Sequence, residues 1–285
     1  MARVDLLAVP AFLRQSSAMP ETVSLRTEDH TAVVTLERPT MPPLFFAEIE
    51  ALFREINADT KVRAVVIRGA GKAFSYGLDL PAAAQEMGHH FQGSTTAAPR
   101  MELLAIIRRL QAAFDAVAAC PVPVIAAVHG WCIGGGVDLI AACDIRLATA
   151  DAKFSVRETK IAIVADLGSL QRLPRLIGQG NTRELAFTGK DVGAARAKEM
   201  GLVNETFASA DALFAAAKSM AAEIAGNAPL TVRGVKQVLD FGEGKSVAEG
   251  LAYVAAWNSA FLASEDLGEA MMAFMEKRPP VFKGR

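Results

Sequence analysis

The sequence is poor in cysteine, histidine and aromatic residues, with three cysteines, four histidines and 7% aromatics in 285 positions. Cys120, Cys132 and Cys143 form no CxxC pair and lie in apolar or alanine-rich surroundings. We therefore expect reduced, buried thiols and no disulfide bond. Because no histidines have the HxxxH or HxxEH spacing of metal ligands, we also expect no metal site.

Long apolar runs and an excess of one charge are missing as well. The apolar stretches are interrupted before the roughly 18 residues that a membrane-spanning helix needs, so we expect no membrane partner. Lys plus Arg (30) balance Asp plus Glu (31), which leaves no basic surplus for a nucleic acid. Neither end carries a recognisable targeting pattern, and on this basis we expect a cytoplasmic location.

Strand and helix patterns alternate over the first two-thirds of the chain. Two β-branched runs around a short polar turn, residues 22–26 and 31–36, predict a hairpin. Helical spacing and short apolar runs then predict further helices (44–56, 101–117 and one after 134–136) and strands (63–68, 122–128 and 145–149). The fold class is therefore α/β.

Helical patterns dominate from Gly168 onward, and the last amphipathic helix is predicted over residues 265–277. We expect three parts in the chain: an N-terminal extension (1–20), an α/β core (21–205) and a helical C-terminal region (206–285).

Two glycine turns follow predicted strands, at the edge of the sheet where α/β proteins bind ligands. The first, KAFSYGLDL (72–80), has the alternative of being an ordinary tight turn. The second, HGWCIGGGVD (129–138), places three glycines at a helix start, where bare backbone N–H groups can approach a ligand. Since neither is a GxGxxG or Walker loop, an oxyanion hole with one N–H from each turn is favoured over phosphate binding.

Three carboxylates are candidates for acid–base chemistry: Asp138, Glu158 and Asp166. Asp166 lies in a mostly apolar run, which would raise its pKa toward that of a general base, although it could equally cap the next helix. Asp138 has the alternative of a first-turn acid facing a helix dipole, and Glu158 that of a solvated charge. Only together do they indicate a site, and the absence of GxSxG leaves serine hydrolysis without a nucleophile.

With these turns and acids, the chain resembles the enoyl-CoA hydratase/isomerase (crotonase) superfamily from about Val23 to the C-terminus. The matching segments are FSYGLDL (74–80), PVPVIAAVHGWCIGGGVDLIAACDIRLA (121–148), ADLGSLQRLPRLIG (165–178) and AFMEKRPPVFKGR (273–285). The resemblance implies a crotonase-like ββα spiral core with a helical C-terminal trimerisation region. It further implies an acyl-CoA thioester substrate, no cofactor beyond the coenzyme A of that substrate, and a homotrimer or a homohexamer made as a dimer of trimers.

Within the superfamily the chain most resembles the Δ(3,5)-Δ(2,4)-dienoyl-CoA isomerases of fatty acid β-oxidation. In that likeness the catalytic acids fall on Asp138, Glu158 and Asp166, with Asp166 taking the C2 proton, Glu158 delivering a proton to C6 and Asp138 as an auxiliary acid. Tyr76 N–H and Gly135 N–H would form the oxyanion hole. The implied substrate and CoA contacts are Ala73, Ser75, Tyr76, Gly77, Leu78, Asp79, Leu80, Gly135 and Gly136.

Three positions depart from the family pattern. Tyr76 stands where small residues are common, Ala162 stands where glycine is frequent, and Lys160 could lower the pKa of Glu158 if it points inward. Two other functions stay open: an enoyl-CoA hydratase that holds a water at Asp138 and Glu158, and a crotonase-fold binding protein without catalysis.

Overall fold

The computed structural model describes residues 21–91 and 96–285, so the expected extension over residues 1–20 lies outside the described residues. Within the described part, no helix is both long enough and apolar enough to cross a membrane. Cys120, Cys132 and Cys143 are buried and unpaired, as the sequence predicts.

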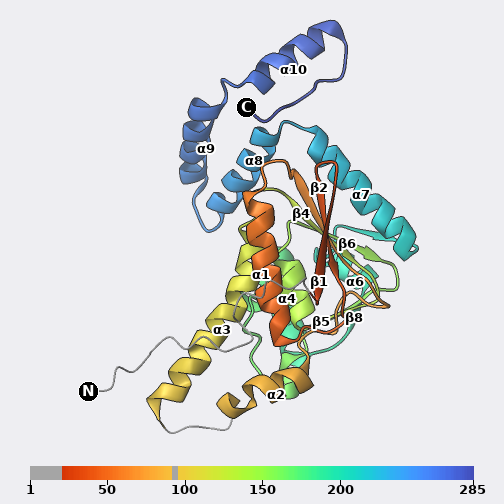
Figure 1. Cartoon of the computed structure of the whole chain (residues 1–285), viewed down its shortest axis with the longest axis vertical. Coiled ribbons are helices and arrows are strands. Elements are labelled where there is room, and N and C mark those ends of the chain that lie inside the picture. The colour runs from red at the N-terminus through yellow and green to blue at the C-terminus, as the bar shows by residue number, and fades with distance from the viewer. Residues whose placement is uncertain (1–20, 92–95) are drawn as a thin grey trace.

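A six-stranded sheet forms the centre of the molecule (Figure 1). The predicted hairpin opens it: β1 (Val23–Glu28) pairs antiparallel with β2 (Thr31–Leu36), with Val23 opposite Leu36. The remaining strands run parallel in the order β1-β2-β3-β4-β6-β9. Their bounds are Ala64–Gly69 for β3, Val124–Val128 for β4, Ile145–Thr149 for β6 and Glu205–Phe207 for β9.

Helices cover both faces of this sheet, and β4 is therefore buried along its whole length. On one face α1 (Pro43–Ala58) and α3 (Ala97–Ala118) enclose the larger core, where Phe45, Phe46 and Phe114 meet. On the other face α7 (Ala210–Gly226) packs through Leu213, Ala217 and Ala221. The α/β class predicted from the sequence is confirmed.

A second, three-stranded sheet supports the glycine turns, and the sequence patterns missed it. It contains β5 (Trp131–Ile133), β7 (Lys153–Ser155) and β8 (Val192–Gly193) in the order β5-β7-β8. Strands of two or three residues are too short to show a period-2 pattern. This sheet leads into α4 (Gly135–Ala141) on one side and α6 (Ala194–Glu199) on the other.

Three further elements complete the region around the candidate site. These are α2 (Leu80–Phe91), the 3₁₀ helix η2 (Glu158–Ile161) and α5 (Ser169–Thr188), in which Gly178 departs from helical geometry.

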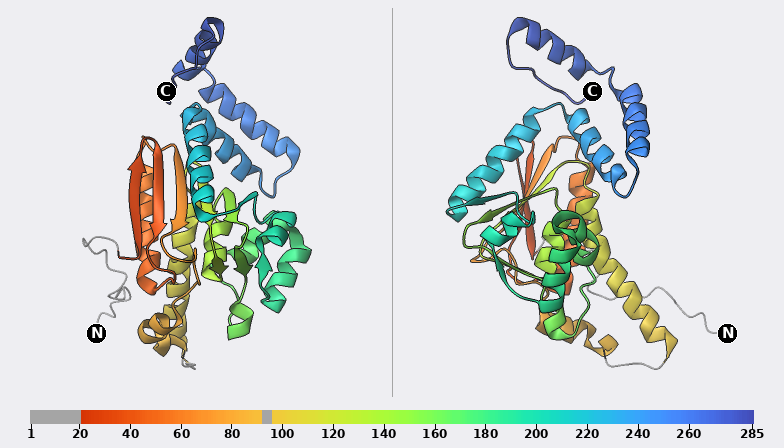
Figure 2. Two further views of the ribbon diagram at one scale, coloured as in Figure 1. Left: turned by 90° about the vertical axis from the view of Figure 1, so that its right-hand side faces the viewer. Right: turned by 180° about the vertical axis from the view of Figure 1, so that it is seen from behind.

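The C-terminal helices α8 (Pro229–Gly242), α9 (Val247–Phe261) and α10 (Glu265–Glu276) form an arm that stands off the sheet (Figure 2). The expected division after residue 205 does not coincide with this arm, because β9 pairs with β6 and α7 packs on the sheet. The part that stands away begins at α8. Helical periodicity alone cannot distinguish a helix that covers a sheet from one that leaves it.

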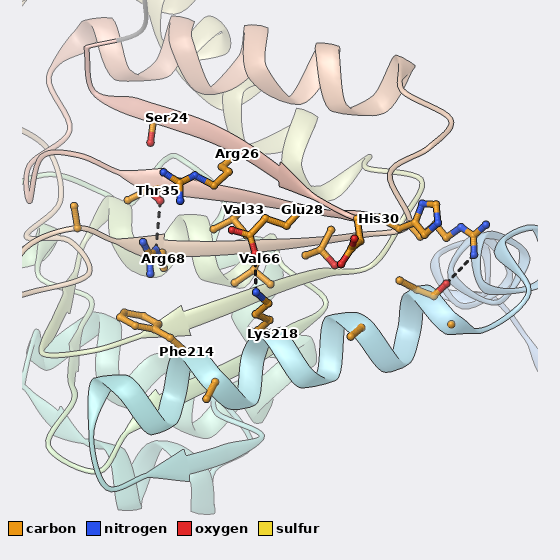
Figure 3. Close-up of a pocket in the computed structure, with 18 of the residues that line it drawn as sticks. Ser24, Arg26, Glu28, His30, Val33, Thr35, Val66, Arg68, Phe214 and Lys218 are labelled. Atoms are coloured by element: carbon orange, nitrogen blue, oxygen red, sulfur yellow. Dashed lines mark hydrogen bonds and ion pairs between the residues drawn. The ribbon is translucent and has the colours of Figure 1, made fainter.

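A groove of about 940 Å³ runs between α7 and the outer face of the hairpin (Figure 3). Lys218 of α7 pairs with Glu28 of β1 at 2.7 Å, and the Arg68 guanidinium lies 5.0 Å from the centroid of the Phe214 ring. None of the three candidate acids lines this groove. The Lys218–Glu28 ion pair in this groove connects the edge hairpin to α7, which is a structural role.

A buried ion pair anchors the arm to the core. Lys236 of α8 is 8% exposed, and its Nζ lies 2.7 Å from Oδ2 of Asp144, at the start of β6. The same Oδ2 accepts the Val124 N–H of β4 at 2.7 Å. One carboxylate therefore fixes α8 relative to two central strands.

We expect Lys236→Met to lower the free energy of unfolding by about 2 kcal/mol, because it leaves the partly buried Asp144 carboxylate without its cation. Denaturant unfolding at fixed protein concentration measures this difference. Lys61→Met, at an exposed position, is the matched control and should change stability by less than about 0.5 kcal/mol. Equal stability of the two variants would contradict the anchoring role.

Candidate active site

The two glycine turns touch each other, and Gly77 is the point of contact. Gly77 has φ +82°, and a Cβ there would stand 2.7 Å from the Ile133 carbonyl oxygen and 3.3 Å from the Gly135 nitrogen. A side chain is therefore excluded at this position by both backbone conformation and space. The structure brings the predicted turns together at the carboxyl ends of β3 and β4, as the sequence suggests.

The backbone donors at this contact differ from the expected pair. Tyr76 N–H already donates to the Pro39 carbonyl at 2.6 Å, and Gly77 N–H donates to Ser75 Oγ at 3.0 Å. Within residues 21–91 and 96–285, no protein acceptor takes the N–H of Leu78 or of Gly135. A Cβ on Gly135 would lie 3.9 Å from the Leu78 nitrogen, so these two free donors are neighbours.

Other predicted contacts of the first turn serve its own structure. Ser75 is buried, and its hydroxyl accepts the Gly77 N–H. Asp79 accepts from Thr40 Oγ1 at 2.9 Å and from Ala82 N–H at 3.1 Å, which fixes the start of α2. Tyr76 and Leu80 are instead exposed, at 44% and 46%.

The remaining predicted contacts are small residues at the junction of the turns. Ala73 is buried, and Gly136 is packed so closely that a Cβ would stand 3.0 Å from Ser75 Cβ. Small residues are thus required here to let the turns approach each other.

Asp138 is 1% exposed and lies in the first turn of α4. Its Oδ1 accepts the Ser169 N–H at 2.5 Å, at the first residue of α5. Burial, with smaller contributions from the Glu158 and Asp166 charges, raises the pKa of Asp138 to about 7 against the lowering effect of the Ser169 N–H. Asp138 therefore links α4 to α5 and is close to its titration point at neutral pH.

Glu158 begins η2 and turns its carboxylate toward the second glycine turn. A Cβ on Gly134, which has φ +52°, would lie 3.3 Å from Glu158 Oε1. The other carboxylate oxygen, Oε2, is buried without a hydrogen-bond partner among the described residues. Burial raises the pKa of Glu158, and the Asp166 charge adds to the shift. An unpartnered buried carboxylate oxygen is suited to meet a proton-bearing group of a ligand.

Asp166 lies between η2 and α5, and burial raises its pKa. It does not cap α5, since the residue in the capping position is Gly168. The carboxylate that takes the first N–H of α5 is Asp138 instead. The capping alternative for Asp166 is therefore wrong, and the electrostatic coupling of all three acids shows that the fold brings them together.

Lys160 points away from the acids. Its side chain packs along Gly189, where a Cβ would meet Lys160 Cγ at 3.0 Å, and its charge lowers the pKa of Asp191. Ala162 has φ +60°, the left-handed conformation that favours glycine. Lys160 thus does not face the acids, whereas Ala162 strains the backbone near the site.

Comparison with known proteins assigns the chain to a family. The family model described as enoyl-CoA hydratase/isomerase matches residues 26–285. The chain belongs to the enoyl-CoA hydratase/isomerase family. A crystal structure of an enoyl-CoA hydratase from Bacillus anthracis superposes on this member with a TM-score of 0.84 at 31% identity, covering 93% of this chain and all of the other. The crotonase fold expected from the resemblance is therefore confirmed.

Two relatives of this enoyl-CoA hydratase/isomerase family member are named Δ(3,5)-Δ(2,4)-dienoyl-CoA isomerases. The mitochondrial one from Dictyostelium discoideum is 41% identical over 94% of this chain and 97% of its own length. The peroxisomal one from Arabidopsis thaliana is 44% identical over 84% of this chain and 86% of its own length.

The organelle names in these relatives correct the expectation of a cytoplasmic location. That expectation was wrong because it took the lack of a recognisable targeting pattern as evidence. Composition and folded-core patterns carry no information about cellular address, which receptors read from separate signals.

Asp138 should make the stability of this enoyl-CoA hydratase/isomerase family member depend on pH. Its pKa is raised from 3.8 to about 7 in the folded chain. As pH rises between these values, the unfolded state loses this proton first, so the folded state is progressively destabilised. The loss of stability is complete above the pKa of Asp138 in the folded state and absent below its pKa in the unfolded state.

We expect Asp138→Asn to remove this penalty while keeping an oxygen for the Ser169 N–H. At about pH 8 the variant should be more stable to unfolding than the wild type by up to about 4 kcal/mol, and at about pH 4 the two should be nearly equal. Denaturant unfolding at the two pH values measures the difference. A difference that is the same at both values would show that Asp138 does not titrate in this window.

Proposed function

We propose that the protein converts 3,5-dienoyl-CoA to 2,4-dienoyl-CoA. The observation that carries this proposal is the set of three coupled, poorly solvated carboxylates, Asp138, Glu158 and Asp166, beside two free backbone N–H groups. Relatives at 41% and 44% identity carry the name of this activity. The reaction moves one proton from C2 and places one at C6, so two acid–base groups are needed at separate points of one substrate.

The thioester oxygen binds between Leu78 N–H and Gly135 N–H in this proposal. Both donors are free of protein acceptors within the described residues and lie side by side. When the C2 proton leaves, negative charge develops on this oxygen, and two preorganised donors stabilise it. Leu78 takes the place expected for Tyr76, whose N–H is engaged by Pro39.

The positions of the acids favour an exchange of the expected proton-transfer roles. C2 is bonded to the thioester carbon, so its base must be close to the oxyanion donors. Glu158 meets this condition because its carboxylate lies against Gly134, the neighbour of Gly135. We therefore assign removal of the C2 proton to Glu158 and protonation of C6 to Asp166. Their raised pKa values suit groups that accept and release a proton near neutral pH.

Asp138 supports the pair without needing to contact the reacting carbons. When Asp138 is protonated it is neutral and leaves the other two acids free to ionise. When it is ionised, its negative charge disfavours a second negative charge in the cluster. Its Oδ1 is occupied by the Ser169 N–H, which leaves it less able to hold the attacking water that a hydratase requires. Proton transfer of this kind uses no redox cofactor or metal, and coenzyme A enters with the substrate.

Glu158→Gln and Asp166→Asn should separate the two proton transfers. In D2O with a 3,5-dienoyl-CoA, we expect Asp166→Asn to keep exchange of the C2 hydrogen but to form the conjugated product at least about 100-fold more slowly. Glu158→Gln should lose both exchange and product. Ultraviolet absorbance follows the 2,4-dienoyl chromophore, and mass spectrometry follows deuterium at C2. Glu184→Gln, at a surface position of α5, is the control.

Different outcomes would contradict different parts of the proposal. Loss of C2 exchange in Asp166→Asn alone would restore the originally expected roles. A wild type that only hydrates a 2-enoyl-CoA, with Asp166→Asn keeping that activity, would make the protein a hydratase. Absence of turnover with either substrate would favour the non-catalytic alternative.

We also propose that the arm α8–α10 joins copies of this chain into a homotrimer or a homohexamer built as a dimer of trimers. Helix α9 has no buried residue, and α10 exposes Phe274 at 82% and Met275 at 80%. Val247 and Leu251 of α9 are exposed at 79% and 62%. Apolar surface of this extent on an arm that stands away from its own core is typical of an interface between subunits.

Light scattering should give a mass of about three or six times the 30.2 kDa of one chain. Phe274→Asp should shift the mass toward the monomer, because it places a charge in the proposed interface. Asp211→Asn, in the exposed first turn of α7, is a control that should leave the mass unchanged. A monomeric wild type at micromolar concentration would contradict the proposal.

A further inference from the structure

The segment that carries Asp166 has no regular secondary structure. It joins η2 to α5 over residues 162–168, and its two ends have positive φ angles, +60° at Ala162 and +123° at Gly168. Ile163 and Val164 are exposed, at 42% and 75%. The position of a proton-transfer group on such a segment depends on contacts from outside it.

Helix α3 holds two successive peptide carbonyls of this segment, one directly through Gln111 and one through Arg172 of α5, which pairs with Asp115 of α3. Gln111 Nε2 donates to the Asp166 carbonyl at 2.6 Å. Asp115 pairs with Arg172 at 2.6 Å, and Arg172 Nη1 lies 3.4 Å from the Leu167 carbonyl. Since Gln111 and Asp115 are four residues apart, they lie on the same face of α3.

The two contacts are not equivalent. Gln111 reaches the peptide of Asp166 itself, over a short distance and with partial burial. The Arg172 contact is longer and falls on the next peptide, and its partner Asp115 is 67% exposed. The donor that most directly fixes the Cα of Asp166 is therefore the Gln111 amide.

We propose that Gln111 is a positioning residue, whose side-chain amide holds the Asp166 peptide so that the Asp166 carboxylate stays among Asp138 and Glu158. The expected effect on turnover rests on the proposed function. A displacement of about 1 Å in a catalytic group can lower a rate by up to about 100-fold. Loss of the Gln111 contact, one of the two that hold this segment, should lower the rate by an amount within that range.

Loosening this segment also has an electrostatic signature. Burial is the main cause of the raised pKa of Asp166, so water that reaches a displaced carboxylate should lower that pKa. Charged groups near this segment include Asp138 of α4, Glu158 of η2, Arg172 of α5 and Asp115 of α3, and the last two pair with each other. Lys160 of η2 lies instead along Gly189. None of them is altered by a change at Gln111.

The test is Gln111→Met, which keeps the length of the side chain and removes its donor. The matched control is Gln171→Met, at an exposed position on α5. With a 3,5-dienoyl-CoA, we expect Gln111→Met to lower kcat by about 10-fold and to change KM by less than about twofold. The control should match the wild type in both constants.

A titration of the substrate-free protein gives a second readout that does not depend on turnover. Carbon-13 labelling of the aspartate carboxyls, assigned with Asp166→Asn, follows the pKa of Asp166 by NMR. Gln111→Met should lower this pKa toward the ordinary value, and Gln171→Met should leave it unchanged. A lower pKa supports the positioning role even if the wild type fails to turn over the dienoyl substrate, in which case only the proposed function fails.

Either of two results would overturn the inference. One is an unchanged pKa of Asp166 in Gln111→Met, whatever happens to kcat, since that would show a general structural effect only. The other is a lowered pKa with wild-type kcat in an active enzyme, because positioning would then be irrelevant to the reaction.

Discussion

The burial of three carboxylates in one small volume is the constraint on which the rest of this structure depends. Burial raises the pKa of Asp138, Glu158 and Asp166, the Glu158 and Asp166 charges raise that of Asp138, and the Asp166 charge raises that of Glu158. Burying ionised carboxylates costs free energy, which hydrogen bonds and the packing of the rest of the fold must offset. The packed sheet, the Ser169 N–H on Asp138 and the Gln111 amide behind Asp166 all provide that support. The result is a cluster of three carboxyls whose pKa values all lie above the ordinary ones.

Much of this arrangement could be predicted from the residues alone. The hairpin, the buried β4 and the helix after Gly134 follow from local patterns, and two glycine turns after parallel strands must meet at one edge of a sheet. An apolar setting likewise indicated the raised pKa of Asp166. These features depend on residue type and spacing, which a sequence states directly.

Other features depend on direction and on contacts between distant segments. The turn FSYGLDL does not tell which of its N–H groups stays free of protein acceptors, because that depends on Pro39, over 30 residues earlier, accepting the one from Tyr76. The capping of α5 by Asp138 instead of Asp166 is likewise a contact across 31 residues. The short strands β5, β7 and β8 and the placement of α7 on the sheet have the same origin. Local periodicity carries no trace of such long-range pairing.

The free donors at the turn contact belong to the main chain, and this affects how the family can diversify. Replacing the Leu78 side chain leaves its N–H in place, so that half of the proposed oxyanion site survives most point mutations. The acids have no such protection, since a single base change can turn an aspartate codon into one for glutamate or glycine. Lineages that inherit this scaffold can therefore keep the two backbone donors while the acids beside them change one codon at a time.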